Sequence, residues 1–178
     1  MSNKEKRIEI LTKAELRIVM KRLTTEILDE IDQPQNLILM GIPTRGVNIS
    51  EFIAWEIFKR IGYKVEKGII DPTLHRDDQS RVGTKSIKVD SIPSSLDDKE
   101  ILLIDDVIYT GRTVRAALEA LNFWGRPKKI MLLTLIDRGY RELPIQPDFC
   151  GKKVLIKKDQ NIELHLKSLD ENEGVFLV

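Results

Sequence analysis

Two adjacent carboxylates, Asp105 and Asp106, stand between an apolar run, residues 101–104, and a short segment of phosphate-binding residue types. That segment, residues 110–113 (TGRT), offers hydroxyl groups and backbone N–H groups at what we expect to be a helix N-terminus. Gly111 lets the backbone approach a ligand closely. Carboxylates do not bind phosphate, but they accept hydrogen bonds from sugar hydroxyls or hold a Mg²⁺ that is shared with a diphosphate. A ligand with a phosphate, a vicinal diol and a diphosphate–metal group therefore fits these residues.

A second candidate site follows another apolar run, residues 37–40, at Thr44, Arg45 and Gly46. Arg45 carries a planar fork of donors, which suits a diphosphate, and it stands beside an expected helix N-terminus. A solvated turn arginine is the alternative interpretation. The chain has no G-x-x-x-x-G-K-[ST] sequence, so a Walker-type nucleotide site is set aside.

Hydrophobic patterning predicts strands that alternate with helices around these two sites. A capping-box pair, Thr12 and Glu15, begins the first expected element, a helix that Pro34 stops. Further expected elements are strands at 37–40, 101–104 and 130–136, and helices at 47–61 and after residue 113. This order predicts an α/β fold with a central, mostly parallel sheet flanked by helices. Ligands bind beyond the C-terminal strand ends of such sheets, where both candidate sites lie.

Residues 71–95 differ from the rest, because they are rich in charge and carry little apolar periodicity. Arg76 and Arg81 fall within this segment. Such a long connection is typical of an active-site lid, so we expect a flexible loop that closes over the site.

The composition sets the class of the protein. The 178 residues are 42% hydrophobic and 32% charged, which favours one globular domain over residues 1–178. The net charge of +1 argues against indiscriminate nucleic-acid binding, and the single cysteine, Cys150, forms no internal disulfide. The first residues have no apolar core of a signal peptide, and no apolar run is long enough to span a membrane. We therefore expect a cytoplasmic protein without membrane association.

Four segments, in this order, resemble the type I phosphoribosyltransferases: 41–46 (GIPTRG), 73–78 (TLHRDD), 104–115 (IDDVIYTGRTVR) and 137–145 (DRGYRELPI). More narrowly, the chain resembles the bacterial pyrimidine operon attenuation proteins that have uracil phosphoribosyltransferase activity. The similarity extends over nearly the whole chain. It implies the type I phosphoribosyltransferase fold, with a flexible loop and a small hood.

The resemblance also implies roles for individual residues. Asp105, Asp106, Arg45 and Arg76 would be the catalytic residues, and Mg²⁺ would be held mainly through the substrate diphosphate and not by a protein metal site. The hood after the third strand would bind the base through Asp137, Arg138 and Gly139, completed by a C-terminal strand around Ile162. Phosphoribosyl pyrophosphate would contact two loops, namely Thr44, Arg45 and Gly46, and Asp105, Asp106, Val107, Ile108, Tyr109, Thr110, Gly111, Arg112 and Thr113.

Members of this family also bind a pyrimidine leader mRNA in response to UMP or UTP. The basic residues that would contact RNA are Arg17, Lys21, Arg22, Arg141 and Lys152, and a solvated helix face is the alternative for those at helical spacing. Two features depart from the family pattern: the stretch 21–25 does not have the particular Thr and His associated with RNA contact, and residues 153–158 lack the usual Pro-Thr pair. Tyr140 also stands where a His is common. A homodimer or a larger homo-oligomer is expected from the same resemblance.

Three functions fit the residues. The first is an enzyme that makes UMP and pyrophosphate from uracil and phosphoribosyl pyrophosphate, with or without regulatory RNA binding. The second is a non-catalytic RNA-binding regulator that senses nucleotides, and the third is a purine-type salvage phosphoribosyltransferase. Arg45 and the paired aspartates favour turnover, because a sensor has less need of a pyrophosphate loop.

Overall fold

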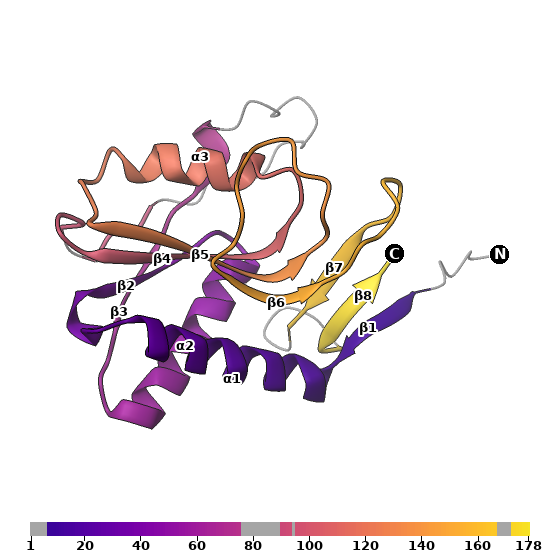
Figure 1. Cartoon of the computed structure of the whole chain (residues 1–178), viewed down its shortest axis with the longest axis horizontal. Helices are drawn as coiled ribbons and strands as arrows, with labels where there is room; N and C mark the ends of the chain where they lie inside the picture. Colours follow the sequence, from indigo (N-terminus) through magenta and orange to yellow (C-terminus); the bar gives the residue numbers. More distant parts are fainter. Residues whose placement is uncertain (1–6, 76–89, 94, 167–171) are drawn as a thin grey trace.

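The computed structural model describes residues 7–75, 90–93, 95–166 and 172–178 (Figure 1). Within this part of the chain, five parallel strands form the main sheet in the order β3-β2-β4-β5-β6. Their bounds are β2 Leu37–Gly41, β3 Glu66–Ile69, β4 Glu100–Ile108, β5 Lys129–Asp137 and β6 Phe149–Lys153. The predicted α/β fold with a central parallel sheet is confirmed.

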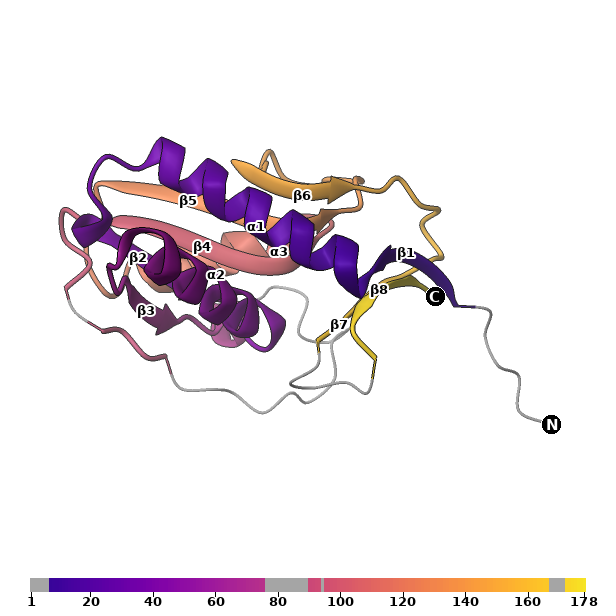
Figure 2. The same ribbon diagram turned by 90° about the horizontal axis from the view of Figure 1, so that it is seen from below.

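Helices cover both faces of the main sheet. Helices α1 (Lys13–Glu30) and α2 (Arg45–Ile61) lie on one face, and α3 (Arg112–Leu121) lies on the other (Figures 1 and 2). Two short 3₁₀ helices, η1 (Pro34–Asn36) and η2 (Pro72–His75), complete the helical elements of the described residues. None of the described helices has the length and the apolar character needed to cross a membrane.

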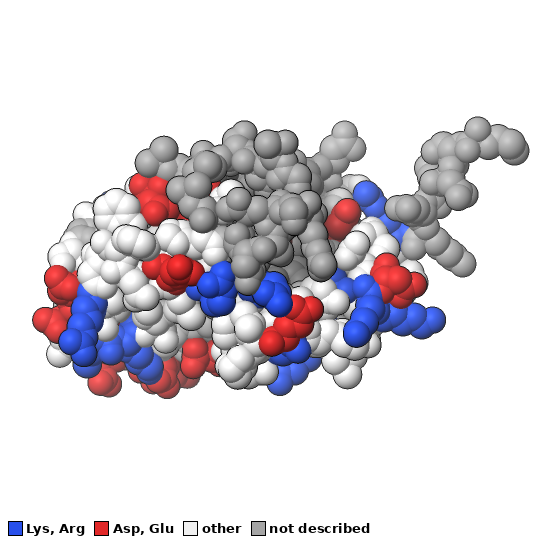
Figure 3. Space-filling model, turned by 90° about the horizontal axis from the view of Figure 1, so that it is seen from above, with Lys and Arg blue, Asp and Glu red and all other residues white. Residues whose placement is uncertain are grey.

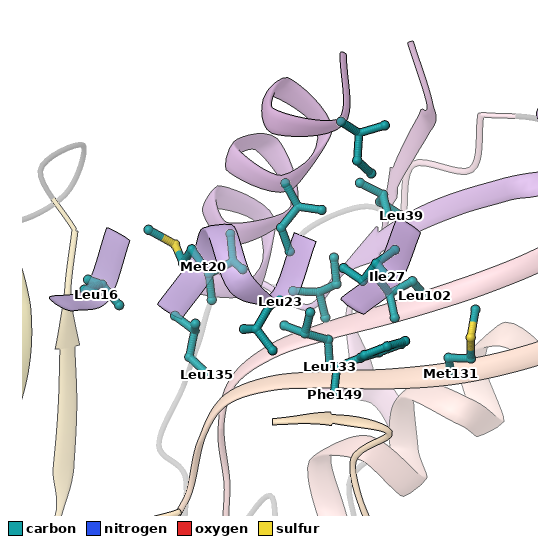
Figure 4. Packing of buried hydrophobic residues seen from close by; sticks show 14 of the residues in the cluster. Leu16, Met20, Leu23, Ile27, Leu39, Leu102, Met131, Leu133, Leu135 and Phe149 are labelled. Carbon is teal, nitrogen blue, oxygen red and sulfur yellow. The ribbon is translucent and has the colours of Figure 1, made fainter. Parts of the chain in front are cut away.

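Helix α1 begins at the predicted capping box. The Thr12 hydroxyl accepts from the Glu15 backbone N–H at 3.3 Å, and the Glu15 carboxylate accepts from the Thr12 backbone N–H at 2.8 Å. Its apolar face, which includes Leu16, Leu23 and Ile27, packs onto the side chains of β4, β5 and β6 (Figure 4). This packing covers the face of the main sheet that lies opposite α3.

A second, smaller sheet forms the hood, which we define as strands β1 (Ile8–Thr12), β8 (Gly174–Leu177) and β7 (Ile162–His165). All its pairings are antiparallel, with β8 in the middle. The hood therefore joins the two ends of the described chain beside the C-terminal edge of the main sheet (Figure 1).

Three details differ from the sequence predictions. The first element is strand β1 and not a helix, and β3, β6 and β8 were not expected. Strand β4 runs through Ile108, so both aspartates belong to the strand and not to the loop after it. The expected strand around Ile162 is present as β7. The missed strands have only four or five residues, and β1, β3 and β6 are also of mixed polarity, so their formation depends on pairing with a neighbour.

Candidate active site

The connections after β2, β4 and β5 meet at one edge of the main sheet. The Ile42 backbone N–H donates to the Ile104 carbonyl oxygen at 2.9 Å, which ties the end of β2 to β4. The Arg138 N–H donates to the Ile108 carbonyl oxygen at 3.1 Å, which ties the end of β5 to the end of β4. Strands β2 and β4 are neighbours in the main sheet, but the helices that follow them, α2 and α3, cover opposite faces of it. This is the position at which open α/β sheets bind ligands.

The N-terminus of α2 lies directly against β4 because residue 46 has no side chain. A Cβ at Gly46 would stand 2.3 Å from the Ile104 carbonyl oxygen, closer than any real contact. Thr44 is the N-cap residue and is exposed, and Arg45, the first helical residue, is half-buried. The peptide between Pro43 and Thr44 is cis. The expected pyrophosphate-binding residues are thus held next to the carboxylate end of β4.

The two carboxylates lie at the end of β4 and shape the backbone that follows. Asp105 is buried, and one of its carboxylate oxygens accepts from the Asp106 backbone N–H at 2.9 Å. Asp106 is half-buried and in turn accepts from the Val107 N–H at 2.8 Å. An ionised carboxylate accepts several hydrogen bonds, so both side chains are of the type that binds sugar hydroxyls.

Residues 109–113, here called the phosphate loop, connect β4 to the first turn of α3. Gly111 adopts a left-handed φ of 91°, a conformation in which side chains are strained, and its carbonyl oxygen accepts the first helical hydrogen bond, from the Arg115 N–H, at 2.9 Å. The N-terminal N–H groups of α3 therefore face the loop, as in other phosphate sites. The loop surrounds a cavity of about 340 Å³ lined by Asp105, Val107, Ile108, Tyr109, Thr110, Gly111, Arg112, Thr113, Val114 and Glu142.

A second segment, residues 140–145, is hydrogen-bonded to the phosphate loop, and we call it the bracket. The N–H groups of Glu142 and Leu143 both donate to the Thr110 carbonyl oxygen, at 3.0 and 3.2 Å. The Arg141 guanidinium donates to the carbonyl oxygens of Tyr109 and Ile145, at 2.9 and 2.8 Å. The loop conformation thus depends on residues about thirty positions further along the chain.

Arg141 is not part of an exposed basic face. Only 12% of its side chain is exposed, and it forms an ion pair at 2.9 Å with Asp137, which is equally buried. Its donors are directed at the protein's own oxygen atoms, so Arg141 has a structural role inside the fold, and its contact with RNA stays a prediction.

The residues expected to bind the base lie beside the phosphate loop. Asp137 ends β5, and its carboxylate accepts from the Gly139 N–H at 2.9 Å. The buried Arg138 guanidinium stacks 3.9 Å from the Tyr109 ring centroid and donates to the Gln160 carbonyl oxygen at 2.7 Å. Because Gln160 precedes β7, Arg138 connects the phosphate loop to the hood.

The composition of the hood differs from the expectation. Asp137, Arg138 and Gly139 belong to the end of the main sheet, whereas Ile162 opens hood strand β7 and pairs with Leu177. The residues expected to bind the base therefore come from the main sheet and from the hood, whereas the sequence prediction placed all of them in the hood.

The expected lid falls largely outside the described residues, and so do Arg76 and Arg81. The chain on either side of the gap is anchored: the Asp71 N–H donates to the Asp90 carboxylate at 2.8 Å, and the Trp124 indole donates to the same carboxylate at 3.1 Å. The described residues contain no group of three or more His, Cys, Asp and Glu side chains that could hold a metal ion. A cation shared with a ligand diphosphate needs fewer protein ligands.

The remaining basic residues of the RNA prediction gather around α1 and its neighbours β1 and β6. Arg22 donates to the carbonyl oxygens of Cys150 and Gly151 on β6, and Lys152 donates to the Ile10 carbonyl oxygen on β1 at 3.3 Å. Arg17 pairs with Glu173 at 3.4 Å but stays 50% exposed, and Lys21 is exposed. Four of the five residues are thus close together in space.

Comparison with known proteins identifies the family. Residues 8–168 match the model of the phosphoribosyl transferase domain. This chain belongs to the phosphoribosyltransferase family. Within this family, it is 44% identical to the bifunctional protein PyrR of Microcystis aeruginosa over 96% of this chain and 97% of that protein. It is 42% identical to the bifunctional protein PyrR of Latilactobacillus sakei, over 94% and 95% of the two chains.

Solved structures of phosphoribosyltransferases share the fold. A hypoxanthine phosphoribosyltransferase from Staphylococcus aureus superimposes with a TM-score of 0.69 at 24% identity, covering 94% of this chain and 89% of that one. A hypoxanthine-guanine phosphoribosyltransferase from Bacillus anthracis gives 0.68 at 16% identity, covering 96% and 98%. The phosphoribosyltransferase fold expected from the sequence is therefore confirmed.

Sequence reasoning did not assign a role to Glu142. Its carboxylate accepts from the Arg112 side chain at 2.8 Å and lines the cavity of the phosphate loop. Residue 142 lies within the fourth family-like segment, but no local spacing predicts a contact with a residue thirty positions away.

Proposed function

We propose that this phosphoribosyltransferase forms UMP and pyrophosphate from uracil and phosphoribosyl pyrophosphate. The observation that carries the proposal is the convergence of three loops on one sheet edge: the Arg45 loop, the aspartate pair with the phosphate loop, and the turn at Asp137. Each offers the chemistry of one part of the reaction, namely diphosphate, ribose 5-phosphate and base. The choice of uracil rests on the likeness to the PyrR proteins over nearly the whole chain.

In this proposal, Asp105 and Asp106 accept hydrogen bonds from the ribose hydroxyls and so orient C1 of the sugar. The N–H groups of the phosphate loop and of the first turn of α3 bind the 5′-phosphate. Arg45, at the N-terminus of α2, binds the departing diphosphate, and Arg76 is proposed to approach it as well. A ring nitrogen of the base attacks C1 as the C1–O bond to the diphosphate breaks, through a transition state with oxocarbenium character. The diphosphate leaves with the bonding electron pair and takes up the proton that the ring nitrogen loses. The reaction then needs exclusion of water more than a strong general base.

Magnesium fits this site as a partner of the substrate. A Mg²⁺ held by the substrate diphosphate would supply positive charge against the charge that develops on the leaving group. The residues available to help hold it are Asp105 and Asp106, whose carboxylates lie at the strand end beside Arg45. The base is proposed to lie against Asp137, Arg138 and Gly139 and under Ile162 of the hood.

One assay compares the three functions that fit the residues. Pyrophosphate release is measured with Mg²⁺, phosphoribosyl pyrophosphate and either uracil, hypoxanthine, guanine or orotate. We expect turnover with uracil alone. Turnover with a purine would support the salvage enzyme instead, and tight binding of phosphoribosyl pyrophosphate without turnover would support the nucleotide sensor.

The same assay tests the site through the double substitution of Asp105 and Asp106 by Ala. We expect a loss of activity of at least about a hundredfold and weaker binding of phosphoribosyl pyrophosphate, because the groups that orient the ribose are gone. The contact surface behind the loop is unchanged, so thermal unfolding should stay cooperative. Unaltered affinity for phosphoribosyl pyrophosphate in the double variant would remove the carboxylates from the proposed site.

RNA binding is the second candidate function, and the cluster of Arg17, Lys21, Arg22 and Lys152 around α1 favours it. These residues come from two elements and form a basic area next to β6, which a single-stranded leader mRNA could follow. UMP or UTP in the active site would act as the signal. A cytoplasmic location, one domain over residues 1–178, and a homodimer or larger assembly stay predictions.

A further inference from the structure

The Glu142 carboxylate lies at the cavity that is proposed to bind a phosphate, where its negative charge would repel the ligand. It lines the cavity of the phosphate loop, and it accepts from Arg112 Nε at 2.8 Å. Arg112 is the first residue of α3, so its guanidinium and the helix N-terminus supply positive charge to the same cavity. A carboxylate at this position offsets part of that charge.

The backbone of residue 142 is held independently of its side chain. Its N–H donates to the Thr110 carbonyl oxygen at 3.0 Å, and Leu143 reinforces this contact at 3.2 Å. A Cβ on Gly111 would approach the side chains of Leu143 and Ile145 at 3.6 and 3.5 Å, so the bracket also packs on the loop. The carboxylate of Glu142 is therefore not needed to hold the bracket on the loop.

On the side of the molecule that carries α3, positively and negatively charged side chains lie close together. Where the described residues are visible from the side of α3, Lys and Arg side chains alternate with Asp and Glu (Figure 3). These are exposed ion pairs, and the Arg112–Glu142 pair is as exposed as they are, so only its place at the cavity sets it apart. Among them, Arg115 and Glu119 form a contact of 2.8 Å on the same helix as Arg112, but neither residue lines the cavity.

We propose that Glu142 is a built-in counter-ion of the phosphate loop, which occupies Arg112 until a phosphate monoester displaces it. The inference rests on the proposed function and deepens it, because it assigns to one residue the control of affinity for the 5′-phosphate. The dianionic phosphate of the substrate repels Glu142 and competes for Arg112. The same repulsion weakens the hold on the phosphate of the product and on free inorganic phosphate.

Glu142→Gln separates this role from a structural one. Glutamine keeps the size and an acceptor oxygen for Arg112 but removes the charge. The matched control is Glu119→Gln, which removes one carboxylate from an ion pair of the same length on the same helix, away from the cavity. Glu142→Ala serves as a second variant of the test site.

Binding of ribose 5-phosphate and of inorganic phosphate is measured by calorimetry for the four proteins. At low ionic strength we expect Glu142→Gln to bind ribose 5-phosphate about three- to tenfold more tightly than the wild type, from the Coulomb energy across a largely aqueous cavity. The gain should shrink as salt rises, because the charges are screened, and Glu119→Gln should match the wild type. Damage to the fold cannot produce a salt-dependent gain in affinity.

Two results would overturn the inference, and they can be told apart. Ribose 5-phosphate that binds to the wild type but no more tightly to either Glu142 variant would refute the counter-ion alone. Failure of the wild type and the Glu119 control to bind ribose 5-phosphate at all would refute the proposed phosphate site, and the counter-ion with it.

Discussion

At the scale of single residues, the pKa of Cys150 is affected by a charge of the candidate site, although Cys150 takes no part in the proposed chemistry. It lies on β6, half-buried, one residue before the glycine that receives Arg22. Burial raises the pKa of its thiol, and the nearby negative charge of Asp137 raises this pKa further. The thiolate is the reactive form, so a raised pKa means less reactive cysteine at a given pH.

We therefore predict that a thiol reagent such as a maleimide modifies Cys150 more slowly in the folded protein than in the same protein unfolded in guanidinium. The midpoint of the rise in rate with pH should lie above the pH at which an ordinary cysteine ionises. The measurement is the modification rate across pH 6 to 10, followed by mass spectrometry. Equal rates for folded and unfolded protein over this range would contradict the assignment.

At the scale of elements, the close contact between α2 and β4 depends on the absence of a side chain at Gly46. Gly46→Ala would place a Cβ 2.3 Å from the Ile104 carbonyl oxygen, so the helix N-terminus must move away from β4. Overpacking of this kind costs about 1–3 kcal/mol of stability. Because Arg45 moves with the helix, we expect UMP formation to fall by roughly a hundredfold, more than the stability change explains.

Thermal unfolding and steady-state kinetics of Gly46→Ala check this prediction. Glu51→Ala is the matched control, since Glu51 is exposed on the same helix. The control should retain both stability and activity within a small factor. Wild-type kinetics in Gly46→Ala would show that the helix position does not set the place of Arg45.

The elements also show which parts of the structure the sequence predicts. Strands β2 and β4 have continuous apolar runs because both faces are covered, and α1 has its capping box, so these elements are visible in short windows. Strands β1 and β6 mix polar with apolar residues, and β8 has only four residues and pairs with β1 from the other end of the described chain. Their formation is a tertiary effect that local pattern does not encode.

The same distinction applies to the site. Asp105, Asp106 and the phosphate loop are contiguous, and their residue types point to a phosphate and a diol without further context. The bracket could not be predicted, since Arg141 and Glu142 reach Tyr109, Thr110 and Arg112 across about thirty residues. Arg141 was assigned to RNA because its charge is visible in the sequence and its burial is not.

At the scale of the whole molecule, the proposed RNA surface and the proposed active site lie on different parts of the protein. The first lies on α1 and β6, and the second lies at the C-terminal edge of the main sheet. Substitution of Arg17 and Lys21 by Ala should therefore weaken binding of a pyrimidine leader RNA and leave UMP formation unchanged. The dependence of log affinity on log salt should become less steep, by about 0.7 for each lost phosphate contact to a single strand.

Filter binding or fluorescence anisotropy between 50 and 300 mM salt provides this measurement. Lys128→Ala is the control, because Lys128 is a similarly exposed cation near the opposite ends of the main-sheet strands. RNA affinity and salt slope that stay the same in the double variant would remove α1 from the RNA surface.

The hood has a consequence for the order in which the molecule is made. Strand β8, from residues 174–177, lies between β1, from residues 8–12, and β7. During synthesis the five strands of the main sheet are all available once residue 153 has emerged, whereas β1 must wait for the last strand. Pairing across so many residues is slow, because a long loop must close first. The main sheet, with the edge that carries the proposed phosphate site, can therefore form before β1 has its partner β8, and the hood forms after it.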